Sequence, residues 1–97
     1  MIRRKTVRLS ETLRLFWKDN PELYHKMLEA RVQRLWSELF GPSIAQYTTN
    51  MYVKNRILYV SMTSSVVRSE LMAMRKRIVI TLNNHAGSDV IDDVMIR

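Results

Sequence analysis

The spacing of apolar residues changes along the chain, and this change limits the fold class more than any other feature. Up to about residue 39, apolar residues recur every three or four positions, as along one face of a helix. Residues 57–62 instead alternate, with Leu58, Val60 and Met62 at every second position, which is typical of a strand with one buried face. Beyond Ser65 the helical spacing returns. The sequence therefore predicts a domain with both helices and a sheet.

The breaks between these segments coincide with proline, glycine and helix-capping residues. We expect helices at 10–19, 21–39 and 65–84, strands at 51–53, 57–62 and 90–96, and a short helical turn at 42–45. The expected N-caps are Ser10, Asn20, and Ser64 or Ser65. Helices are expected to end at Gly41 and over 83–87. Asn55 is expected to take the left-handed conformation of a tight hairpin turn. The order ααββαβ predicts an α+β fold, with a three-stranded sheet packed on helices that cover one face.

Length and composition favour one domain in a reducing compartment. The 97 residues leave room for one core, which we assign to residues 10–97, with residues 1–9 as a flexible basic arm. The sequence has no cysteine, which excludes disulfides and thiolate metal sites. No apolar run approaches the roughly 20 residues needed to span a bilayer. We therefore expect a cytoplasmic protein without a membrane partner.

The residues that could carry catalysis are few and poorly spaced. His25 and His85 have no partner at a metal-ligand spacing, so both are predicted to be surface residues. Asp92 and Asp93 are adjacent and would point to opposite faces of a strand. Two glycines are too few for the glycine-rich motifs that bind nucleotides or hold a nucleophile. We expect no enzyme activity, no cofactor and no metal.

Positive charge is the strongest functional signal. Sixteen Lys and Arg residues outnumber nine Asp and Glu residues, giving a net charge of +7. Residues 50–86 alone hold six basic residues and one acidic residue. Such a field concentrates polyanions near the protein. The alternative is that the charge serves only solubility.

Basic residues on ordered elements are what phosphate contacts require. They lie in the arm, beside the expected hairpin turn and on the last helix, where Arg68 and Arg75 would share a face. The predicted contacts are Arg3, Arg4, Lys5, Lys54, Arg56, Arg68, Arg75 and Lys76. The alternative for the helix is an ordinary solvated face.

Aromatic residues offer a second kind of contact. Tyr52 and Tyr59 fall on neighbouring strands, and an outward placement beside Lys54 and Arg56 would let them stack on bases. Packing of these rings between sheet and helices is the placement that the pattern favours. The tryptophans, Trp17 and Trp36, lie on apolar helical stripes and are predicted to anchor the core.

Several spaced residues resemble the DciA-like family over about residues 9–97. The first motif contains a tryptophan, a glycine and an alanine, and the second a serine pair followed by Glu-Leu. The matching segments are Leu35-Trp36-x-x-Leu39-Phe40-Gly41-x-x-Ile44-Ala45-x-x-Thr48, Ile57-Leu58-Tyr59-Val60, Thr63-Ser64-Ser65-Val66-Val67-Arg68-x-Glu70-Leu71, Ile78 to Asn83, and Val90-Ile91-x-x-Val94-x-Ile96-Arg97.

This resemblance implies a KH-like fold and a place in bacterial replication, where family members bind DNA and assist the replicative helicase. DNA, single-stranded or duplex, and the helicase are therefore the expected partners. Two alternatives stay open. One is an RNA-binding KH-like module, and the other is a protein-interaction adaptor whose surface is the apolar face of the first helix, with Leu13 and Phe16.

Overall fold

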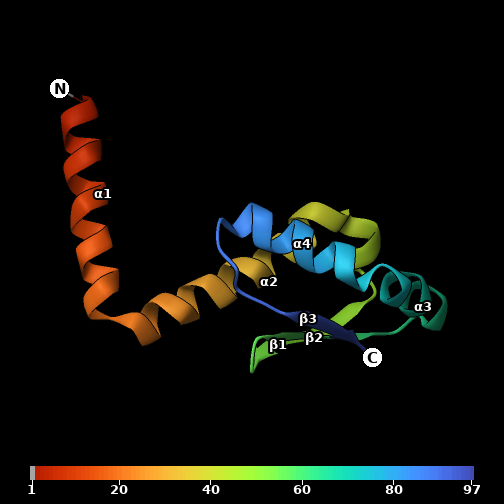
Figure 1. The fold of residues 1–97 in the computed structure, drawn as a ribbon. Coiled ribbons are helices and arrows are strands. Elements are labelled where there is room, and N and C mark those ends of the chain that lie inside the picture. Colours follow the sequence, from red (N-terminus) through yellow and green to blue (C-terminus); the bar gives the residue numbers. More distant parts are fainter. Residues whose placement is uncertain (1) are drawn as a thin grey trace.

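The computed structural model describes the backbone of residues 2–97 and the side chains of residues 11–97. Within that range it contains four helices and three strands (Figure 1). They are α1 (Ile2–Asp19), α2 (Pro21–Ala45), β1 (Thr48–Lys54), β2 (Ile57–Met62), α3 (Ser65–Ala73), α4 (Arg75–Ala86) and β3 (Asp93–Ile96). The predicted α+β class and the order of helices and strands are confirmed, except that the third predicted helix is divided in two.

The sheet has β2 at its centre, antiparallel to β1 and parallel to β3. Alternation along β2 buries Leu58, Val60 and Met62, as predicted. Figure 1 shows α2 and α4 together above one face of the sheet, while α1 extends away from it. The helices therefore cover a single face, and the opposite face of the sheet is left open.

Trp36 anchors the core between α2 and the sheet. Its ring is fully buried, and its Nε1 donates a hydrogen bond to Thr48 Oγ1 at 3.2 Å. Thr48 Oγ1 in turn donates to the carbonyl of Ile44 at 3.2 Å, so the chain is fixed where α2 passes into β1. Trp17, predicted to do the same, is only half-buried and packs on Phe16 and Tyr24 where α1 meets α2.

One predicted helix cap is wrong, and a second holds the N-cap position without a side-chain cap bond. Helix α1 already begins at Ile2, so Ser10 lies inside it and is not its N-cap. Asn20 makes no side-chain cap for α2 but donates from Nδ2 to the carbonyl of Phe16 at 2.8 Å, which satisfies the end of α1. Pro21 does start α2, as expected. Gly41, with non-helical φ 77° and ψ 177°, interrupts α2, and a last helical turn follows it, as expected for a helix stop at Gly41 and a short helical turn at 42–45.

The predicted single helix over 65–84 is also wrong, because the chain turns at Met74 (φ −106°, ψ 13°). Leu71 of α3 and Ile78 of α4 are both buried, whereas Met74 between them is 44% exposed. The turn lets the two helices reach the core from different directions. No glycine or proline marks the break, so packing rather than local sequence produces it.

The start of α3 and the end of α4 agree with the prediction. Ser64 Oγ accepts a hydrogen bond from Val67 N at 3.3 Å at the start of α3, and the left-handed Gly87 ends α4.

The segment between α4 and β3 is held by one amide side chain. Asn83 Oδ1 accepts from the backbone N–H groups of Val90 and Ile91 at 3.0 and 3.1 Å. Its Nδ2 donates to the Ile91 carbonyl at 2.9 Å and to Asp89 Oδ1 at 3.1 Å. These bonds fold the loop over the core, and the last strand therefore begins at Asp93 rather than at the expected residue 90.

Burial on α4 predicts a matched pair of mutational outcomes. Leu82 is fully buried and Ile80 is 60% exposed on the same helix. We expect Leu82→Ala to lower the free energy of unfolding by about 2–5 kcal/mol, since it removes contacts and leaves a cavity. Ile80→Ala should change it by no more than about 0.5 kcal/mol. Urea unfolding followed by circular dichroism measures both, and equal losses would contradict this packing of α4.

Candidate nucleic-acid interface

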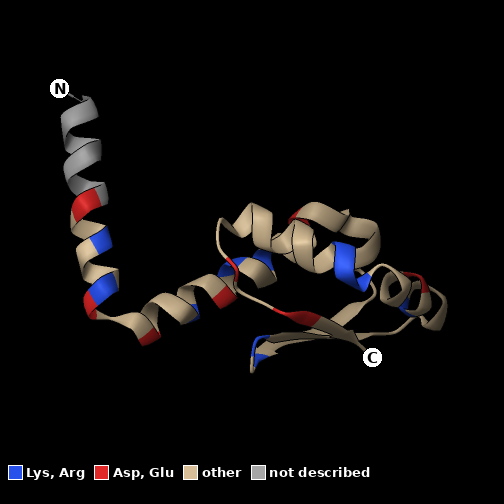
Figure 2. Cartoon of the chain, in the orientation of Figure 1, with Lys and Arg blue, Asp and Glu red and all other residues tan. Residues whose placement is uncertain are grey.

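The predicted phosphate contacts do not form one continuous patch. Figure 2 shows basic residues at the tip of the β1–β2 hairpin and, separately, at the start of α4. Lys54 and Arg56 belong to the first group, and Arg75 and Lys76 to the second. The third group, Arg3, Arg4 and Lys5 of the proposed arm, lies outside the residues whose side chains are described.

Arg56 is engaged in a contact within the protein. It sits in the two-residue turn between β1 and β2, where Asn55 has φ 52° and Arg56 has φ 64°. The left-handed conformation costs a residue other than glycine roughly 1–2 kcal/mol. Arg56 Nε and Nη2 bind the two carboxylate oxygens of Asp92 at 3.0 and 2.9 Å, and its carbonyl accepts from Asp92 N at 2.7 Å. Asp89 adds a weaker ion pair at 3.4 Å.

This contact ties the hairpin tip to the loop before β3. The hydrogen bond from Arg56 holds the pKa of Asp92 below its usual range, with the positive charge adding to the effect. The same hydrogen bond raises the pKa of Arg56. Arg56 therefore presents less free charge to a phosphate than its place at the tip predicts. Lys54, also exposed, has no ion-pair partner among the described residues.

The break at Met74 changes the expected geometry of the basic helix face. Arg68 lies on α3 and Arg75 on α4, so the prediction that they share one helix face is wrong. Arg68 is half-buried, and its Nε is buried without a hydrogen-bond partner. Arg75 Nε lies 3.9 Å from Asp93 Oδ1. Lys76 and Arg77 are exposed beside a hollow of about 380 Å³ at the α3–α4 turn.

The tyrosines lie on the open face of the sheet. Tyr52 pairs with Tyr59 across β1 and β2, on the face opposite the buried Leu58 and Val60. Their ring centroids are 4.9 Å apart with an interplanar angle of 15°, which is a stacked pair. The favoured prediction, packing between sheet and helices, is therefore wrong. The outward alternative is confirmed, because the helices occupy the other face.

Arg97 completes this cluster and was not among the predicted site residues. Its guanidinium carbon lies 4.9 Å from the centre of the Tyr59 ring, and its Nη2 donates to the Tyr52 hydroxyl at 2.6 Å. The backbone of Arg97 continues the pairing of β3 with β2, through hydrogen bonds to Val60 and Met62. Alternation from the buried Ile96 could have placed its side chain on the open face. The parallel pairing of β3 with β2, which brings Arg97 to the tyrosines, is a feature of the tertiary structure and cannot be read from local sequence.

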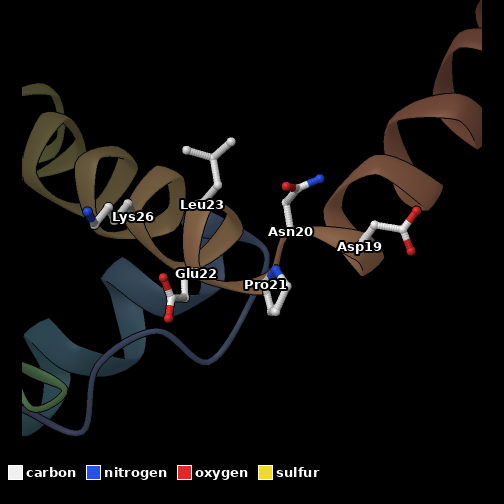
Figure 3. A pocket seen from close by; sticks show the side chains of 6 residues that line it. All are labelled: Asp19, Asn20, Pro21, Glu22, Leu23 and Lys26. Carbon is white, nitrogen blue, oxygen red and sulfur yellow. The ribbon is translucent and has the colours of Figure 1, made fainter.

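Other features of the described residues lie outside these basic and aromatic groups. A hollow of about 470 Å³ lies at the α1–α2 junction. Figure 3 shows that its lining mixes a leucine with acidic and basic side chains. It is lined by Asp19, Asn20, Pro21, Glu22, Leu23 and Lys26. Both histidines are exposed, as predicted. No group of three potential metal-binding side chains occurs among the described residues. No helix in that part of the chain is both long and apolar enough to cross a bilayer.

Comparison with known proteins identifies the family. A family model described as "Dna[CI] antecedent, DciA" matches residues 8–96, nearly the whole chain. The chain belongs to the DciA family. This family is linked to loading of the bacterial replicative helicase and is not a catalytic family. No curated protein matches this DciA-family chain.

The Arg56–Asp92 contact predicts a measurable titration. Since the pKa of Asp92 is depressed in the folded state, the contact stabilises the fold above the unfolded pKa of about 3.9. That contribution is lost as the pH falls through the lower folded value. In Arg56→Gln, the Asp92 pKa should rise toward its ordinary value, as measured by NMR titration of the carboxyl carbon. Lys54→Gln is the control, and an unchanged Asp92 pKa in Arg56→Gln would contradict the assignment.

Proposed function

We propose that this chain is a non-catalytic DNA-binding accessory of bacterial replication that assists the replicative helicase. The observation that carries the proposal is the family match over residues 8–96, since the family is linked to helicase loading. The net charge of +7 supports a polyanionic partner. The family is not a catalytic one, which supports a binding role.

Charge pairing divides the proposed DNA contacts into stronger and weaker ones. Lys54 and Lys76 are exposed, and neither has an ion-pair partner among the described residues. A phosphate can bind them without displacing a carboxylate. Arg56 would first have to leave Asp92, and Arg75 has Asp93 nearby. The two lysines are therefore the leading phosphate contacts among the described side chains, and Arg3, Arg4 and Lys5 stay predicted contacts.

DNA binding should show the salt dependence of phosphate neutralisation. With about five phosphates neutralised, log K against log salt should have a slope near −4.5 on duplex DNA, and a shallower slope on single strands. Lys76→Gln should make the slope shallower by about one. Fluorescence anisotropy with labelled oligonucleotides measures both slopes.

The control for that experiment is Lys26→Gln, which removes the same charge from an exposed residue on α2, outside the proposed contacts. Its slope should match that of the unmodified protein within error. Binding that does not change with salt would overturn the DNA-binding role. Equal effects of Lys26→Gln and Lys76→Gln would instead reject Lys76 as a specific contact.

Helix α1 favours a second candidate function, that of a protein-interaction adaptor. Leu13 and Phe16 are each 45% exposed, and with Trp17 they lie on one side of the helix. A hollow of about 590 Å³ adjoins this side, lined by Leu13, Arg14, Trp17, Lys18 and Tyr24. Apolar side chains rimmed by basic ones are typical of a surface for another protein. The helicase is the partner that the family favours, and both roles are compatible.

This second function predicts a separable defect. Leu13→Glu should reduce co-elution of the chain with the bacterial replicative helicase at least tenfold, since it places a carboxylate in the apolar side. DNA affinity should change little. Leu15→Glu is the matched control, because Leu15 is 61% exposed on the opposite side of α1. Equal losses from the two variants, or none from Leu13→Glu, would reject this side of α1 as the docking surface.

A further inference from the structure

The open face of the sheet carries a preformed unit of two rings and one cation. Tyr52 and Tyr59 are stacked with centroids 4.9 Å apart, and the Arg97 guanidinium contacts both side chains. The 2.6 Å hydrogen bond from Arg97 to the Tyr52 hydroxyl fixes the orientation of the outer ring. The side chains are held in place before any partner arrives, so binding there loses little conformational entropy.

One ring face in this unit remains available. β1 is an edge strand of the described sheet, and Tyr52 lies on it. One face of the Tyr52 ring packs on Tyr59, so the other is directed toward the edge, where no further strand follows. Tyr52 is 36% exposed. A flat aromatic group that reaches this exposed edge would extend the Tyr59–Tyr52 stack.

The charges around the ring favour an anionic partner. Lys54 lies two positions from Tyr52 on the same strand face, toward the hairpin tip. Arg97 lies toward the other end of the sheet. The backbones of Lys54 and Arg97 are separated by four residues of β2, or about 13 Å, and the Arg97 guanidinium reaches back to the Tyr59 ring and the Tyr52 hydroxyl. A ligand with a flat ring between negatively charged groups matches this arrangement.

We propose that the Tyr52 ring is a stacking site for an unpaired base of single-stranded nucleic acid, with Lys54 and Arg97 beside the flanking phosphates. This inference rests on the proposed nucleic-acid-binding function and gives it a strand preference. Bases in a duplex are stacked on each other, so their faces cannot reach the ring. An unpaired base exposes its face, and stacking on an aromatic side chain strengthens binding whatever the base.

The test compares Tyr52→Leu, Tyr52→Phe and the unmodified chain by anisotropy with labelled oligo(dT), oligo(rU) and a matched DNA duplex. Tyr52→Leu should weaken single-strand binding by about 5- to 150-fold. The salt slope and the duplex affinity should stay unchanged, because a neutral ring is removed. Tyr52→Phe keeps the ring and should bind within about twofold of the unmodified chain. The dT and rU arms show which single strand is preferred.

Direct attachment provides a second measurement that needs no variant. Oligonucleotides containing 5-bromodeoxyuridine, irradiated with the unmodified chain, should crosslink to Tyr52, as mapped by mass spectrometry. Unchanged single-strand affinity in Tyr52→Leu together with no crosslink at Tyr52 would overturn the inference, and so would equal losses on single strands and duplex. A change in oligomeric state without a change in affinity would assign the face to a second copy.

The proposed function fails in a different way. If the unmodified chain binds neither single strands nor duplex, both proposals are rejected. If it binds the duplex with the expected salt slope and single strands no better after correction for charge, the DNA-binding role stands and the stacking site is rejected.

Discussion

Burial of one face of β2 is the constraint on which the rest of the structure depends. Leu58, Val60 and Met62 all point toward α2 and α4, and β2 pairs with a strand on each side. Because side chains alternate across a strand, this burial also decides which residues of β1 and β3 face the helices. A shift of one residue would expose the core of the domain. The register of the whole sheet follows from three apolar side chains.

The same constraint creates the candidate binding face. Once Leu58 and Val60 point inward, Tyr59 between them must point outward, and its partner Tyr52 with it. The helices have already covered the apolar side, so the tyrosines are stabilised by each other and by Arg97. Aromatic pairs across strands stabilise a sheet in their own right. Structural stacking and a site for a base are compatible, because only one face of Tyr52 is used within the protein.

Some basic side chains of this protein bind groups within the fold and are not free for a partner. Arg56 binds Asp92, and Arg31 Nη1 donates to the carbonyl of Ala86 at the end of α4, at 2.9 Å. Such residues add to the net charge but also join parts of the chain distant in sequence. A count of basic residues therefore overstates the surface open to a polyanion. The exposed lysines Lys54 and Lys76 retain their charge for a partner, and their positions could be predicted from the sequence.

The sequence by itself determined the class of fold, the order of helices and strands, the buried face of β2, the turn at Asn55 and the left-handed end of α4 at Gly87. These depend on side-chain periodicity and on local backbone preferences, which act within a few residues. Tertiary structure decided the break at Met74, the early start of β1, the Arg56–Asp92 contact and the approach of Arg97 to the tyrosines. Each of these depends on which distant segments pack together. Arg97 and Tyr52 are 45 positions apart, and only the pairing of β3 with β2 brings them together.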